Sequence, residues 1–112
     1  MTIITLRRVT SYTVRIELPL AVGAGERASE VTGRLDASLP AQSGRAVRDA
    51  QLDSEIRRGR HLARVRVSMT ADGDDPGSAL VAAMNVLRQA IGADAPAWDL
   101  AGTTATVAPV PA

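Results

Sequence analysis

The sequence of 112 residues contains no cysteine, no phenylalanine and no lysine, and it has one histidine, one tryptophan and one tyrosine. Without cysteine, neither a disulfide framework nor a thiolate metal site can form. Because His61 is the only histidine, a zinc cluster or a catalytic pair built on histidine has no second member. We therefore expect no metal and no cofactor. Because aromatic residues are so few, the core must be filled with aliphatic side chains.

Long apolar segments are also missing. No stretch approaches the roughly 20 apolar residues that a membrane span needs, and residues 1–8 lack the apolar run of a signal peptide. We expect a cytoplasmic protein without a membrane partner. All 13 basic residues are arginine and alanine is abundant, which indicates the coding bias of a high-GC bacterial genome.

What is present is typical of a globular protein, with 46% hydrophobic and 22% charged residues. The length suits one domain with a real core. We expect a single α+β domain over residues 1–108, followed by a short proline-containing tail over residues 109–112.

Hydrophobic periodicity predicts six secondary-structure elements. Alternation of apolar and polar residues marks the strands, and apolar spacings of three and four mark the helices. Pro19, Pro40 and Gly92 are expected to end the elements that precede them. The expected order is a strand over 4–18, a helix over 26–39, strands over 46–56 and 61–71, a helix over 77–91 and a strand over 98–107.

The two middle strands are expected to form a hairpin that turns at Arg58-Gly59, where glycine suits a turn with positive φ. In this register apolar residues face apolar residues and opposite charges face each other, and a slip of one residue would break both patterns. The expected pairs include Leu52 with Val65, Ala50 with Val67 and Asp53 with Arg64.

The helix over 77–91 has the clearest boundaries. Asp75 is a suitable N-cap and Pro76 a suitable first residue. Beyond its expected buried stripe of Leu80, Ala83, Met84, Leu87 and Ile91, three further apolar residues widen the surface sideways, which is typical of a contact site. The expected self-association residues are Val81, Ala82 and Val86, and a homo-oligomer is an expected partner state.

The order of elements resembles the ferredoxin-like β-α-β-β-α-β sandwich, which implies a four-stranded antiparallel sheet with two helices on one face. That fold hosts many unrelated functions, so the resemblance implies none. Its exposed face should be too polar for the dry core of a dimer. The residues expected on it are Thr13, Arg15, Asp53, Arg64, Arg66, Thr104 and Thr106.

Charge is segregated along the chain, with a net +4 over residues 44–70 and −4 over residues 71–112. The basic segment predicts a β-ribbon that contacts nucleic acid or another anion, whereas the overall charge of +1 favours a solvated turn. An RNA-recognition sheet is excluded because the segment around Arg58-Gly59 has no aromatic residue to stack on bases. The candidate contacts are Arg57, Arg58, Arg60, Arg64 and Arg66.

Two loops allow weaker interpretations. The aspartates of residues 72–75 lack the ligand spacing of a calcium loop and are better explained as a helix cap. The segment Val22-Gly23-Ala24-Gly25 before a helix resembles the ligand loop of amino-acid-binding regulatory (ACT-type) domains. That resemblance implies a small-ligand-binding regulatory domain.

The sequence therefore predicts a small non-enzymatic interaction module that binds a protein partner or itself, through the second helix or a strand edge. The alternative is an accessory nucleic-acid-binding protein that uses the ribbon from Arg57 to Arg66. The small-ligand regulatory domain is the third possibility. No motif of nucleophile, phosphate loop or paired histidines is present, so we do not expect an enzyme.

Overall fold

The computed structural model describes residues 9–21 and 28–111. The expected beginning of the first strand before residue 9 and the loop at residues 22–25 lie outside these ranges. Among the helices within them, none is long and apolar enough to cross a membrane. The elements are β1 (Thr10–Pro19), α1 (Ala28–Gln42), β2 (Val47–Arg58), β3 (His61–Gly73), α2 (Pro76–Ile91), the 3-10 helix η2 (Gly92–Ala97) and β4 (Thr104–Pro109).

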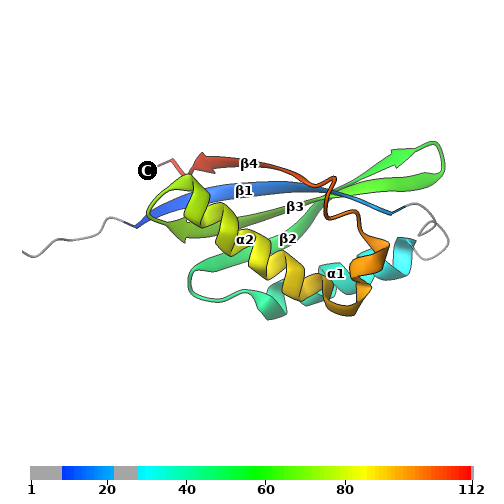
Figure 1. The fold of residues 1–112 in the computed structure, drawn as a ribbon, viewed down its shortest axis with the longest axis horizontal. Helices are drawn as coiled ribbons and strands as arrows, with labels where there is room; N and C mark the ends of the chain where they lie inside the picture. Colours follow the sequence, from blue (N-terminus) through cyan, green and yellow to red (C-terminus); the bar gives the residue numbers. More distant parts are fainter. Residues whose placement is uncertain (1–8, 22–27, 112) are drawn as a thin grey trace, which may run out of the picture.

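The four strands form one antiparallel sheet in the order β2-β3-β1-β4. Both helices lie on the same side of this sheet (Figure 1). α1 packs against β2, and α2 packs against β3, β1 and β4. The protein is thus α+β, with a sheet that has one covered face and one open face.

An aliphatic layer joins the sheet to the helices. Every second residue of β1, from Tyr12 to Leu18, is buried, and the same alternation runs along β3 from Val65 to Ala71. α1 contributes the stripe that its spacing predicts: Ala28, Val31, Leu35 and Leu39 are all buried. Trp98 and Tyr12, the two aromatic residues, are also buried in this layer.

The boundaries predicted for α2 are confirmed. The Asp75 side chain accepts a hydrogen bond from the Ser78 backbone N–H at 2.7 Å, Pro76 opens the helix, and Gly92 caps its end with φ +51°. α1 extends further than predicted and contains Pro40. Ser43 follows the helix, and its hydroxyl donates a hydrogen bond to the Leu39 carbonyl in the last turn at 3.1 Å.

The buried stripe of α2 differs from the prediction. Leu80 and Met84 are only partly buried, whereas Ala79, Val86 and Ala90 join the core. The reason is that α2 contacts both the sheet and α1, so its buried surface is wider than one stripe. The three expected self-association residues are therefore separated: Val81 is 63% exposed, Val86 is 8% exposed, and Ala82 is half-buried.

The predicted register of the β2-β3 hairpin is wrong. The turn is Gly59-Arg60, with Gly59 at φ +61°, so that Arg58 pairs with His61. Leu52 pairs with Val67 instead of Val65. The turn lies one residue later than predicted, and this moves the partner of Leu52 by two residues. The ladder also has three register shifts, between Arg48 and Gln51, between Leu52 and Ser54, and between Ile56 and Arg57, of which the two nearest the turn cancel at Leu52. Such bulges insert an unpaired residue and change which face the following side chains occupy; Asp49, at the first shift, has φ +56°.

The last strand begins later than predicted. Residues 92–97 form η2, and Trp98 makes only an isolated bridge with Leu20. A turn follows, in which Asp99 accepts the Gly102 N–H at 3.0 Å. β4 then starts at Thr104 and includes Pro109, a residue that sheets tolerate at an edge.

The placement of Val86 and Val81 on α2 yields a stability prediction. Val86→Glu should lower the free energy of unfolding by about 2–4 kcal/mol, because it removes a buried apolar side chain and places a carboxylate in the core. Val81→Glu, on the exposed side of the same helix, should change it by less than about 0.5 kcal/mol. Urea denaturation of the two variants checks this; equal destabilisation would contradict the orientation of α2.

Candidate functional site

The open face of the sheet is polar, as the alternation of β1 predicts. The side chains on it come from β1, β3 and β4, because paired residues of an antiparallel sheet share a face. They include Thr13, Arg15, Glu17, Arg64, Arg66, Thr104 and Thr106. Asp53, the remaining residue expected there, lies at the register shift between Leu52 and Ser54, where the alternation is interrupted.

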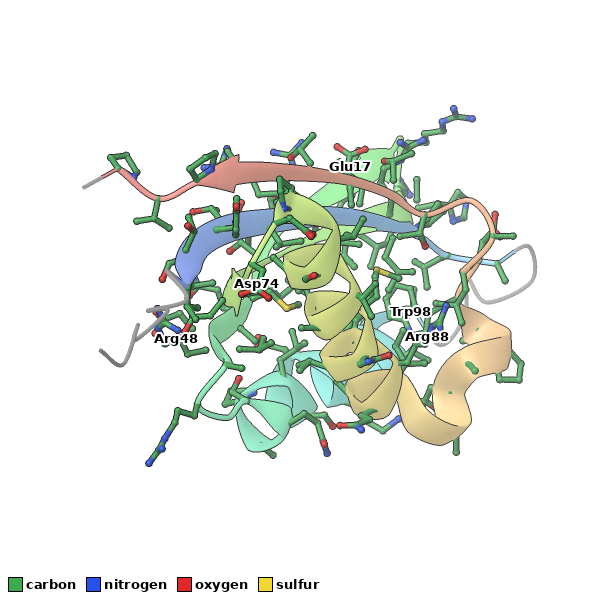
Figure 2. The ribbon with its side chains drawn as sticks, turned by 60° about the vertical axis from the view of Figure 1, so that its left-hand side comes forward. Glu17, Arg48, Asp74, Arg88 and Trp98 are labelled. Atoms are coloured by element: carbon green, nitrogen blue, oxygen red, sulfur yellow. The ribbon has the colours of Figure 1, made fainter. Side chains whose placement is uncertain are left out.

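Glu17 is the centre of an ion-pair cluster on this face. Its Oε1 accepts a hydrogen bond from Arg66 Nη2 at 2.8 Å, and its Oε2 accepts one from Arg64 Nη1 at 3.2 Å. Figure 2 shows Glu17 on the side of the sheet away from α2. The hydrogen bonds from Arg66 and Arg64 lower the pKa of Glu17 and outweigh the desolvation of its carboxyl group. Arg64 therefore pairs with Glu17, and the predicted pairing with Asp53 is wrong.

A second cluster joins three strands at the other end of the face. Arg48 Nη1 donates to Asp72 Oδ2 at 2.9 Å, and Arg48 Nη2 donates to Ser11 Oγ at 3.1 Å. The Ser11 hydroxyl in turn donates to Asp72 Oδ1 at 2.7 Å. These bonds, from Arg48 first and Ser11 second, lower the pKa of Asp72. The cluster links the outer strand β2 to the central strands.

The five arginines of the predicted basic ribbon differ in their ion pairing. Arg64 and Arg66 bind Glu17, and Arg57 donates to Glu55 at 3.0 Å. The remaining two, Arg58 and Arg60, are exposed at the hairpin tip and make no ion pair with another described residue. Three of the five arginines are thus ion-paired, and their two carboxylate partners offset two of the five positive charges.

A shallow hollow of about 400 Å³ lies on the open face beside β4, lined by Arg15, Glu17, Arg66, Thr104, Ala105 and Thr106. Arg15 and the threonine hydroxyls can donate hydrogen bonds there. Because its pKa is lowered and two guanidinium groups bind it, the Glu17 carboxylate stays ionised near neutral pH and is poorly suited to donate a proton. Among the described residues, no group of three or more metal-ligating side chains occurs.

The second surface is the outer edge of β4, which pairs with no strand within residues 9–21 and 28–111 and is called its free edge below. Val110 donates its N–H to the Ser11 carbonyl at 2.9 Å, which fixes the direction of every backbone group in the strand. Residues of an antiparallel ladder alternately bond to the neighbouring strand and point away from it. Thr104, Thr106 and Ala108 therefore bond to β1. Ala105 and Val107 direct both their N–H and their C=O to the unpaired edge.

The two outer strands differ in how they expose that edge. β2 is interrupted by three register shifts, and half of its 12 residues are charged. Bulges and charges are devices that discourage strand addition. β4 pairs with β1 without a register shift and carries no charge. α2, the helix that packs against β4, is also poor in charge: its 16 residues include one charged side chain, Arg88.

The candidate edge residues, Ala105 and Val107, did not emerge from the sequence. Both fall in the strand predicted over 98–107, but the direction of their backbone groups depends on the pairing with β1, which no local pattern reveals. The available signal was the uncharged run Thr103-Thr104-Ala105-Thr106-Val107-Ala108. This run contrasts with the charged sequence of β2, but it does not by itself place the segment at an edge of the sheet.

The Glu17 cluster predicts a pH-dependent stability. A carboxyl group whose pKa is lowered on folding stabilises the fold above its unfolded pKa, taken as 4.5, and this stabilisation is lost as pH falls through the folded pKa. Glu17→Gln should therefore lower the urea midpoint at pH 7, and its difference from the wild type should shrink below pH 4.5. A difference that persists unchanged into strong acid would contradict this. Replacing Arg64 and Arg66 by glutamine should remove the pH-dependent part.

Comparison of this chain with protein-family models, with curated proteins and with solved structures found no match.

Proposed function

We propose that the protein is a non-enzymatic interaction module that binds an extended protein segment by strand addition at the β4 edge. The observation that carries the proposal is the pair of outward-directed residues, Ala105 and Val107, in an uncharged strand without a register shift. An added strand gains main-chain hydrogen bonds, and its alternate side chains contact the two sheet faces. No nucleophile or general acid is required for this activity.

We further propose that the domain has the ferredoxin-like topology. The strand order β2-β3-β1-β4, with antiparallel neighbours throughout, supports it, as do the two helices on one face (Figure 1). In this arrangement β4 is an outer strand, and its free edge is open to a partner for that reason. The topology explains why β4 is an outer strand. The proposed function is argued from the backbone groups of that strand and not from the topology, because a fold by itself implies no function.

The lack of charged side chains within β4 and the single one in α2 favour a protein partner over nucleic acid. The core of a protein interface is depleted in charged side chains, as β4 and α2 are. The nucleic-acid alternative retains one supporting observation, the exposed Arg58 and Arg60 at the hairpin tip. Two such cations supply few phosphate contacts. We therefore expect at most weak binding of duplex DNA, which should disappear at about 0.2 M salt because salt weakens phosphate contacts.

The proposal predicts that binding depends on the outward backbone N–H groups of β4. A labelled peptide with the sequence of residues 102–110 should bind the full chain saturably, because it can form a fifth strand beside β4. Ala105→Pro should abolish this binding, since proline removes an outward N–H and its ring obstructs an added strand. The bond pattern to β1 is untouched by that substitution, because Ala105 points away from β1. Fluorescence polarisation measures the effect.

Ala105→Val is the matched control. Valine is close to proline in size, keeps the N–H and suits a strand, so this variant should bind the peptide as the wild type does. Circular dichroism should show that both variants fold. Peptide binding that is equal for Ala105→Pro and wild type, or absent from wild type, would contradict the proposed function.

A further inference from the structure

The free edge of β4 offers backbone groups in a symmetric arrangement. Ala105 and Val107 present donors and acceptors on either side of Thr106. The outward position before them is Thr103, whose N–H already donates to the Leu100 carbonyl at 3.3 Å. The outward position after them is Pro109, which has no N–H. The edge therefore carries two complete donor–acceptor residues, centred on Thr106 and bounded at both ends by residues that cannot donate.

This symmetry identifies the partner, given the strand addition proposed above. We propose that the strand which pairs with β4 is the β4 of a second copy of this chain, antiparallel about a twofold axis at Thr106. Ala105 of each copy then faces Val107 of the other, and each of these pairs exchanges two N–H···O=C bonds. The two sheets become one sheet of eight strands, with all four helices on the same side.

Other registers use the edge less well. A shift of one residue would bring helix-face side chains onto the open face of the neighbouring sheet. A shift of two residues in one direction sets Ala105 opposite Pro109, which places proline inside a ladder that it can only interrupt. A shift of two in the other direction sets Val107 opposite Thr103, which lies outside β4. Only in the register centred on Thr106 does each residue with an outward N–H and an outward C=O face another such residue.

The side chains near the axis suit a second copy. Twofold symmetry places like residues near each other, and β4 has no charge to repel its own image. On the open face Thr106 meets Thr106, a favourable cross-strand pair, and on the helix face Ala105 meets Val107. Arg15, the nearest cation on this face, is paired with Thr106 from β1. The two Arg15 residues are thus separated by three strand spacings, about 14 Å, at which distance salt screens their repulsion.

The absence of cysteine permits a direct test of this register. Thr106→Cys introduces the only thiol of the chain, at a non-hydrogen-bonded pair where the two Cα atoms lie about 4.5 Å apart, within the range of a disulfide. Under mild oxidation this variant should form covalent dimers more than about tenfold faster than Thr104→Cys. Thr104 is the matched control because it lies on the same face of the same strand, but its thiols would stand about four residues, or 13 Å, apart.

The outcomes separate the two proposals. Adding Ala105→Pro to Thr106→Cys should remove the rapid cross-linking, and sedimentation of the wild type should show a concentration-dependent dimer. Equal, slow cross-linking of both cysteine variants with a monomeric wild type would overturn the self-pairing, and peptide binding would then show whether strand addition still stands. Rapid cross-linking of Thr104→Cys would overturn the register. Failure of both the peptide and the cross-link would overturn both proposals.

Discussion

Burial of every second side chain of β1 is the constraint on which the rest of this structure depends. Val14, Ile16 and Leu18 are inaccessible to solvent beneath the helices, and they contribute about 1.5–3 kcal/mol each to the hydrophobic free energy of folding. The intervening residues must then lie on the open face, where Glu17 binds Arg64 and Arg66. Since β3 and β4 pair with opposite sides of β1, the same strand determines that β4 is left with a free edge.

Charge is arranged so that the two edges of the sheet differ. On the β2 side, cross-strand ion pairs such as Arg48 with Asp72 occupy the open face, and bulges distort the outer strand. β4 itself has no charged side chain, and α2 has one, Arg88. Charges and bulges at an edge strand discourage the addition of another strand. They occur at the β2 edge, whereas β4 has neither. An interface of this length is small, so the dimer should be weak and reversible.

Local signals in the sequence determined which elements were predicted well. The limits of α2 followed from Asp75, Pro76 and Gly92, whose effects act within one helical turn. The open face followed from the strict alternation in β1. The hairpin register failed because the turn is Gly59-Arg60, one residue later than the pairing of charges and apolar residues suggested. The bulges were not predicted because they leave little local trace: Asp49 adopts a left-handed conformation that aspartate tolerates, but the sequence does not require it there. The buried side of α2 failed because it depends on where α1 packs, which is a tertiary effect.

The candidate site was out of reach of sequence reasoning for a similar reason. Which N–H groups of β4 point outward depends on a hydrogen bond between Val110 and Ser11, two residues that are distant in the chain. The charge-free segment around Thr106 could be seen in the sequence, but its position at an edge could not. Val86 illustrates the converse, because an apolar residue expected at a contact surface is part of the core.

The most direct measurement is amide hydrogen exchange of Ala105, Thr106 and Val107 as a function of protein concentration. In dilute protein the outward N–H groups of Ala105 and Val107 should exchange rapidly, while that of Thr106, which bonds to β1, should be protected. At high concentration the account predicts that Ala105 and Val107 become protected together and that Thr106 changes little. Rapid exchange of Ala105 and Val107 at every concentration would contradict the pairing of β4 with a second copy of the chain.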